Sequence, residues 1–281
     1  MIPPAIDTAA TREFVIRPRT GWVSIDWREL WEARELLYFL VLRDVKVRYK
    51  QTVLGVAWAV LQPLFTMIIF TVIFGRFANI PSDGVPYALF VFAGLLPWTF
   101  FSNNIGQASM SLMNQQALLT KIYLPRLFVP SASIGSGFID LGVSFVVFAM
   151  LMLYYGFGVG IGVLAVPLLV LLTVAASLGV GLLLAALIVT YRDFRYVVPF
   201  LVQSLMYLSP VIYPVSMVPA KWQPVLAINP MAGIIDGFRS ALLGLPWNVT
   251  TMLVSSASSL LLLAYGLFYF RKMERGFADV A

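Results

Sequence analysis

Long uncharged runs of apolar residues alternate with short charged segments along this chain. The run from Thr52 to Gly75 contains no ionisable residue, and it exceeds the roughly 20 residues that a helix needs to cross about 30 Å of hydrocarbon. Further apolar runs follow, and together they predict six membrane-spanning helices at residues 53–75, 87–109, 127–155, 163–190, 197–218 and 249–270. The predicted fold class is an all-α polytopic membrane protein.

The remaining segments complete the predicted domain organisation. Residues 1–26 hold two adjacent prolines and scattered charges, which predicts a mobile cytoplasmic tail without a cleaved leader. Residues 27–50 mix Trp and Leu with many charges, a pattern typical of an amphipathic helix in the membrane interface. Residues 51–281 form the transmembrane domain. Within it, residues 219–248 hold two apolar pieces that are each too short to span, which predicts a re-entrant helical hairpin between spans five and six.

The positions of Lys and Arg predict the orientation. With both termini in the cytoplasm, sixteen of the nineteen basic residues lie on the cytoplasmic side, and Arg76, Lys221 and Arg239 lie outside. Such an asymmetry is the usual signal of orientation in multi-pass proteins. The net charge of +6 fits loops that face anionic lipid, so membrane lipids and not nucleic acid are the expected partners.

Composition excludes several kinds of chemistry. The chain is 60% hydrophobic and 11% charged, and it has no Cys and no His. Thiol nucleophiles, disulfides, the usual zinc ligands and imidazole acid–base catalysis are therefore excluded, and no metal site is expected. No glycine is followed by lysine, so the chain lacks a phosphate-binding loop of the Walker type. We expect a transport subunit without catalytic residues, driven by another chain.

Three features inside the predicted spans stand out. Pro63 predicts a kink or local unwinding of the first span. The spacings Ser131 to Gly135 and Ser133 to Gly137 predict a close helix contact, in the bundle or in a dimer. Asp140 lies about 20 Å into the third span at 1.5 Å per residue. A lone carboxylate there should face the bundle interior, form hydrogen bonds with Ser or Asn groups, or be protonated. Its role is either structural, as a polar contact between helices, or part of transport.

Six short motifs carry a resemblance to a known family. They are RYKQTVLGVAWAVLQPL (48–64), LLPWTFFSN (95–103), LLTKIYLPR (118–126), YRDF (191–194), SPVIYP (209–214) and NPM (229–231). In this order, and with six spans, they resemble the permease subunit of ABC transporters that export polysaccharides and O-antigens, related to teichoic acid and polyol-phosphate exporters. The similarity runs from about Arg34 onward, and the N-terminal extension departs from it.

The resemblance implies a homodimer in the bacterial inner membrane with two copies of a cytoplasmic ATP-binding subunit. ATP and Mg²⁺ would bind to that subunit, and this chain would hold no cofactor. The substrate would be a lipid-linked polysaccharide, and the pair of helices in residues 222–243 would close the outer end of the channel. The expected contacts with the ATP-binding subunit are Arg34, Arg43, Lys46, Arg48, Gln115, Gln116, Lys121, Arg192, Asp193 and Arg195.

Sugar polymers present apolar C–H faces and hydroxyl groups, so a conduit for them favours aromatic rings between small polar groups. The residues that offer this mixture are Trp98, Phe100, Phe101, Asn103, Asn104, Tyr207, Ser209 and Tyr213. Aromatic residues also form ordinary belts at membrane interfaces, and this alternative stays open. Two other functions are possible: an ABC permease for a drug or lipid, and an ion-coupled carrier that uses Asp140.

Overall fold

The computed structural model describes residues 27–50, 56–116 and 124–274, and all regular structure in these ranges is helical. Five of these helices are long and apolar enough to cross a membrane: Ala57–Phe77, Tyr87–Asn114, Phe128–Tyr154, Ile161–Thr190 and Val249–Glu274. One further apolar helix, α8 (Phe194–Leu208), is shorter. The all-α membrane class is thus confirmed for the described ranges, while six full spans and a re-entrant hairpin stay predictions.

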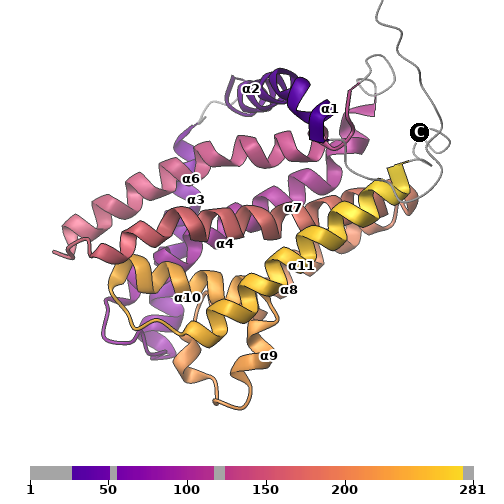
Figure 1. Ribbon diagram of the computed structural model, residues 1–281. Coiled ribbons are helices and arrows are strands. Elements are labelled where there is room, and N and C mark those ends of the chain that lie inside the picture. The colour runs from indigo at the N-terminus through magenta and orange to yellow at the C-terminus, as the bar shows by residue number, and fades with distance from the viewer. Residues whose placement is uncertain (1–26, 51–55, 117–123, 275–281) are drawn as a thin grey trace, which may run out of the picture.

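Helix α4 (Tyr87–Asn114) forms the centre of the molecule. It packs against α6 (Phe128–Tyr154), α7 (Val166–Thr190) and α10 (Pro230–Leu243), and α7 packs in turn against α11 (Val249–Glu274). Figure 1 shows α4, α6, α7 and α11 running side by side. Every residue from Ala88 to Trp98 is buried. The first half of α4 is therefore the protein core.

Glycine allows the closest helix contact, between α7 and α11. A Cβ atom on Gly179 of α7 would lie 2.5 Å from the carbonyl of Leu262 in α11, and a Cβ atom on Gly266 would meet the backbone of Gly179. Small residues permit such backbone approach in membranes, where apolar side chains alone gain little from leaving lipid.

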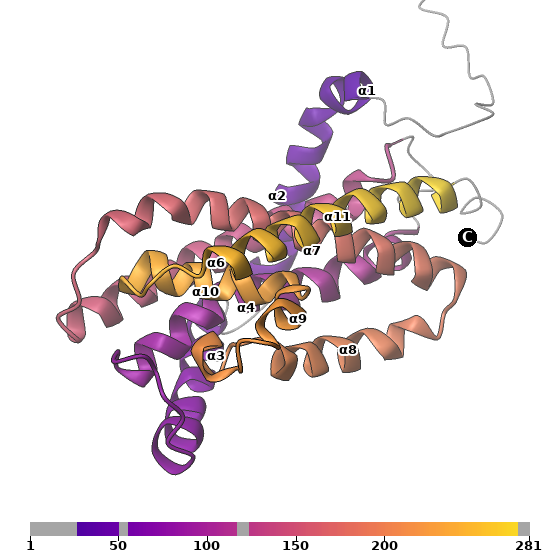
Figure 2. The ribbon, with the colours of Figure 1, turned by 60° about the horizontal axis from the view of Figure 1, so that its bottom comes forward.

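Two helices stand apart from this central group. Helix α3 (Val56–Phe70) continues as the π-helical segment η1 (Thr71–Phe77), and Figure 2 shows α3 and α8 set off from the other long helices. The helix is continuous through Pro63, so it is not unwound there, and the alternative of a kink stays a prediction. Residues 53–55, which open the predicted first span, lie outside the described ranges.

The N-terminal helical region is divided in two. Helix α1 (Trp27–Glu32) is followed by α2 (Arg34–Lys50), which packs along α6 (Figure 1). A Cβ atom on Gly135 of α6 would lie 2.7 Å from a methyl group of Val41. Gly137 likewise faces Asn104 of α4. The predicted small-residue motif of α6 therefore makes contacts within the bundle.

Helix α4 extends past the predicted end of the second span at residue 109. The hydroxyls of Ser109 and Ser111 donate to the carbonyls of Gly106 and Ala108, at 2.9 Å and 2.7 Å. These polar side chains are satisfied by their own helix, so they do not end it. Residues 110–114, which follow the predicted second span, thus belong to α4, and residues 117–123 lie outside the described ranges.

The fifth predicted span, 197–218, is interrupted. Helix α8 begins earlier, at Phe194, and ends at Leu208, because Ser209 takes an extended conformation before Pro210, as a residue preceding proline commonly does. Its 15 residues correspond to about 22 Å, less than the hydrocarbon thickness. After it come η3 (Val215–Met217), α9 (Gln223–Ala227) and α10.

The NPM motif forms the start of α10. The Asn229 side chain accepts a hydrogen bond from the Met231 N–H at 3.0 Å, and Pro230 occupies the first turn, where its missing N–H costs nothing. The remaining connection, between α6 and α7, contains the short 3₁₀ helix η2 (Ile161–Ala165). Both predicted pieces of residues 219–248 are thus helical.

Candidate functional site

A polar stripe runs along the second half of α4. Between residues 99 and 107, the residues that are only partly buried or exposed recur at helical spacing: Thr99, Ser102, Asn103, Gly106 and Gln107. Positions three and four apart share one helix face, so these residues form a single surface. We call it the α4 polar stripe.

The α4 polar stripe borders two cavities. The first, of about 660 Å³, lies between the end of α2 and helices α3, α4 and α6, and its walls include Trp58, Gln62, Thr99, Asn103 and Asp140. The second, of about 620 Å³, lies between α3, α4 and α8, and its walls include Gln62, Trp98, Asn103, Arg195 and Tyr207. Gln62 of α3 and Thr99 and Asn103 of α4 border both cavities. Pro63 borders only the first cavity, and Thr66 borders only the second.

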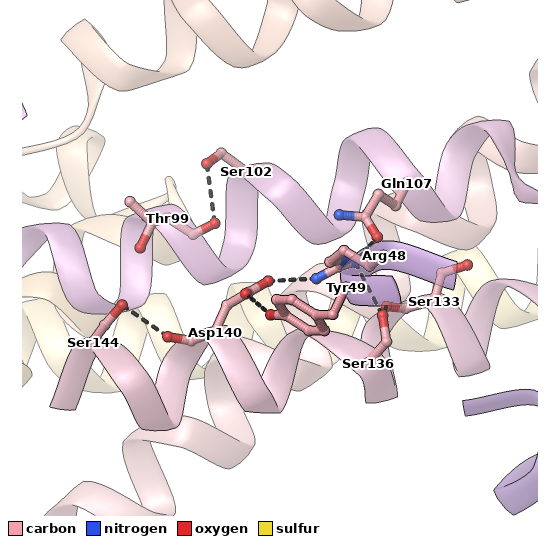
Figure 3. Close-up of polar contacts among 9 residues, drawn as sticks. All are labelled: Arg48, Tyr49, Thr99, Ser102, Gln107, Ser133, Ser136, Asp140 and Ser144. Carbon is pink, nitrogen blue, oxygen red and sulfur yellow. Dashed lines mark hydrogen bonds and ion pairs between the residues drawn. The ribbon is translucent and has the colours of Figure 1, made fainter. Parts of the chain in front are cut away.

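A charged cluster contributes to the wall of the first cavity, and Figure 3 shows its polar contacts. The guanidinium of Arg48, in the last turn of α2, donates to the carboxylate of Asp140 in α6 and to the side-chain oxygen of Gln107 in α4. It also donates to the hydroxyl of Ser136 at 3.1 Å. The Tyr49 hydroxyl donates to the second oxygen of Asp140. Asp140 is therefore paired with a cation and a phenol from α2. The sequence predicted a location facing the bundle interior, bonds to Ser or Asn groups, or protonation.

Burial reinforces the role of Tyr49 as a donor. Burial, and secondly the hydrogen bond to Asp140, raises the pKa of the Tyr49 phenol to about 12, because both disfavour the phenolate. The group stays protonated at neutral pH. Tyr49 therefore serves the side chain of Asp140 as a hydrogen-bond donor.

Arg239, which the sequence predicts to lie on the outer side, is buried within the protein. It lies in α10 with 1% of its surface exposed. Its guanidinium donates to the carbonyls of Phe90, Pro210, Val211 and Tyr213, at 3.1, 2.6, 2.7 and 3.3 Å. It also stacks 3.5 Å from the centre of the Phe90 ring. The side chain therefore fixes the non-helical SPVIYP segment against α4.

Five of the eight predicted conduit residues border one or both of these cavities, and the other three border neither. Trp98, Asn103 and Tyr207 border the second cavity, and Phe100, Asn103 and Asn104 border the first. Phe101, Ser209 and Tyr213 border neither of these two cavities. Ser209 is fully buried and accepts a hydrogen bond from Asn229 at 2.8 Å. The Asn104 amide is also buried, and it has no hydrogen-bond partner within the described part of the chain.

The predicted contact residues for a cytoplasmic partner are mostly accessible. Arg34, Lys46, Gln116, Arg192, Asp193 and Arg195 are exposed, and Arg43 and Gln115 are partly buried. Arg48 is turned into the cluster with Asp140, and Lys121 lies outside the described ranges. Figure 2 shows the end of α7, the start of α8 and the end of α11 at the same end of the bundle.

Comparison with known proteins identifies the family. Residues 35–243 match the model of the ABC-2 type transporter family. The chain belongs to the ABC-2 type transporter family. It is a multi-pass membrane permease, a transport subunit without an ATPase domain, of a family whose members pair with ATP-binding subunits.

Several curated relatives cover most of the chain. It is 30% identical over 217 residues to the O-antigen export system permease protein RfbA of Myxococcus xanthus, covering 76% of this chain and 82% of that protein. It is 24% identical over 208 residues to the polysialic acid transport protein KpsM of Escherichia coli, covering 73% and 80%. It is 26% identical over 223 residues to the inner membrane transport permease YadH of Escherichia coli K12, covering 74% and 85%.

Sequence reasoning missed the residues that join the site together. Arg48 was assigned to an external contact, and Gln107, Gln62 and Ser136 were not singled out. A signal existed for one of them, because Asp140 is an acid inside a predicted span and therefore needs a partner. Arg48 and Asp140 are 92 positions apart in the sequence. The sequence alone therefore did not show that Arg48 is the partner of Asp140.

Proposed function

We propose that this chain is the membrane subunit of an ATP-driven exporter of a lipid-linked, O-antigen-like polysaccharide. The observation that carries the proposal is the 30% identity to an O-antigen export permease over three quarters of the chain. The α4 polar stripe and its aromatic neighbours support it, since amides, hydroxyls and rings match the hydroxyl groups and C–H faces of sugars.

The proposed assembly is a homodimer of this chain with two cytoplasmic ATP-binding subunits in the bacterial inner membrane. ATP and Mg²⁺ belong to those subunits. Both termini lie in the cytoplasm, and α8 with the segment that follows it makes the fifth of six crossings. Helices α9 and α10 form the re-entrant pair at the outer side. The clustering of exposed basic residues at α2 and at the start of α8 supports this orientation.

The test is to delete the gene and restore it on a plasmid in the native strain. We expect the surface polysaccharide to disappear on deletion while lipid-linked polymer accumulates in the cytoplasm, and to return with the plasmid. An ATP-binding subunit should copurify with the tagged chain, and ATP hydrolysis should require that subunit. A normal surface polymer in the deletion strain would refute the proposal.

Charge reversal at Arg192 and Arg195 tests the docking part of the proposal. Both side chains are exposed at the start of α8, so the fold should tolerate the change. Reversed charge at an interface opposes binding of the original partner, and we expect ATP hydrolysis to become uncoupled from export. Normal export by this variant would exclude docking at this loop.

A second candidate is export of a drug or a lipid by the same architecture. The similarity to YadH favours it, because the name of that permease specifies no polysaccharide. Such a chain would still copurify with an ATP-binding subunit, but its activity would not depend on polysaccharide synthesis. An ion-coupled carrier is disfavoured by the family assignment and by the pairing of Asp140 with Arg48.

A further inference from the structure

Helix α2 is docked on the transmembrane bundle along its length. Leu40 is buried in a cluster with Phe128 and Ala132 of α6, and Val41 fills the space left by Gly135. Packing of this kind fixes the distance between two helices, because a side chain at residue 135 would push α2 away. The α2 helix is therefore not held at the membrane surface by lipid alone.

The end of α2 is fixed to two spans at once. Arg48 bonds Asp140 and Ser136 in α6 and Gln107 in α4, and Tyr49 bonds Asp140. The side chains of Arg48 and Asp140 are 23% and 26% exposed, so solvent screens their attraction less than it would on an open surface. Packing and charge together join α2 to both spans.

This attachment leads directly to the cavities. Gln107 belongs to the α4 polar stripe, one turn after Asn103 and two turns after Thr99. Those two residues border both cavities. A continuous series of contacts therefore leads from Arg48 through Gln107 to the walls of both spaces.

We propose that α2, α6 and the second half of α4 move as one rigid body, and that Arg48, Tyr49 and Asp140 transmit motion from the ATP-binding subunit to the conduit. The proposal rests on the proposed function, because the motion enters at α2 only if that subunit docks there. The three residues are positioning residues, since they act by holding helices together.

Disulfide cross-linking tests whether α2 slides. The chain has no cysteine, so Val41→Cys with Gly135→Cys can be made without removing native thiols. A Cβ atom on residue 135 would lie 3.8 Å from the Cβ of Val41, within the roughly 3.5–4.5 Å of a disulfide. We expect the oxidised complex to deliver as much polymer per ATP as the reduced one. Export that stops on oxidation and returns on reduction would overturn the proposal.

Substitution tests the transmitting residues. In inverted membrane vesicles that carry the whole complex, Arg48→Gln and Asp140→Asn should each lower the polymer delivered per ATP hydrolysed by about tenfold. Arg48→Lys should retain more coupling, because it keeps the charge opposite Asp140. This ratio does not depend on the amount of folded complex, so a purely structural loss would not change it.

The matched control is Glu274→Gln, which removes an ion pair that forms within one helix. Arg271 forms an ion pair with Glu274 at 2.9 Å, and its side chain and that of Glu274 are 20% and 18% exposed, but both residues lie in α11. We expect this variant to keep the wild-type ratio. An unchanged ratio in Arg48→Gln as well would refute the transmitting role.

Failure of this inference and failure of the proposed function give different results. If the wild-type vesicles take up no polymer on addition of ATP, the proposed function fails. If they do, and the cross-link blocks uptake or Arg48→Gln leaves the ratio unchanged, only the rigid-body inference fails. Should Arg48→Gln prevent assembly of the complex, the cross-linked protein decides the question, because it retains Arg48 and Asp140.

Discussion

The two halves of α4 share one continuous helix but lie in opposite surroundings. From Ala88 to Trp98 every residue is buried, while from Thr99 onward a polar stripe faces two cavities. Each half contacts a buried or partly buried arginine. Arg239 binds backbone carbonyls beside the first half, and Arg48 binds the side chains of Asp140 and Gln107 beside the second.

The difference shows how one membrane helix can serve two purposes. Backbone carbonyls cannot change their charge or exchange partners easily, so Arg239 fixes one conformation of the segment after α8. Side-chain partners at a cavity wall can move with their helices, so Arg48 joins elements that can shift together. We therefore expect substitutions near the first half to damage the fold, and substitutions near the second half to damage transport.

The largest effect should come from Arg239→Met. The change removes the donor from the four carbonyls that Arg239 bonds, and each unsatisfied buried acceptor costs roughly 1–3 kcal/mol. We expect loss of folded protein from the membrane, measured by fluorescence-detected size exclusion of a tagged chain. Arg239→Lys should be intermediate, because one ammonium group cannot reach every acceptor. A stable Arg239→Met protein would remove the distinction between the two halves.

Two aromatic substitutions should separate folding from transport. Both residues border the second cavity, but Trp98 ends the buried half and is 3% exposed, whereas Tyr207 is 59% exposed. Trp98→Ala should lower stability by about 3 kcal/mol or more. Tyr207→Ala should leave the melting temperature in detergent nearly unchanged and reduce export. Normal export by Tyr207→Ala would count against its place in the conduit.

Two glycines of α4 provide a smaller and closely matched comparison. A Cβ atom on Gly94 would lie 2.8 Å from the guanidinium of Arg239, whereas one on Gly106 would meet no atom within 4 Å. Gly94→Ala should destabilise the protein by about 1–3 kcal/mol through overpacking. Gly106→Ala should be neutral or stabilising by up to about 1 kcal/mol, because alanine favours helix. Thermal inactivation in detergent measures both, and equal effects would contradict the comparison.

The smallest expected effect concerns Tyr49→Phe, which removes one hydrogen bond to Asp140 and should cost about 1 kcal/mol. The pKa of Tyr49 is raised to about 12 in the folded protein, above its ordinary value of about 10. The folded state therefore holds this proton more tightly, and its contribution is complete below about pH 10 and is lost as the pH rises toward 12. The stability difference from Tyr49→Phe should shrink over that interval, and a constant difference would contradict the assignment.

The sequence by itself determined the helical membrane class and the location of most long helices. Uninterrupted apolar runs have no stable alternative to a helix in lipid, because unpaired backbone groups are costly there. The starts and ends of α6 and α7 accordingly match the predicted runs closely. Helix ends set by local hydrogen bonds were less accurate, as the extension of α4 through Ser109 and Ser111 illustrates.

Only the tertiary structure decided which polar groups meet. Arg48 and Asp140 are separated by 92 positions, and Arg239 and Phe90 by 149. Hydrophobic periodicity assigns a residue to a face but does not say which helix covers that face. Both contacts depend on close helix packing at a glycine, at Gly135 for Arg48 and at Gly94 for Arg239. The absence of a side chain at each glycine lets the other helix approach.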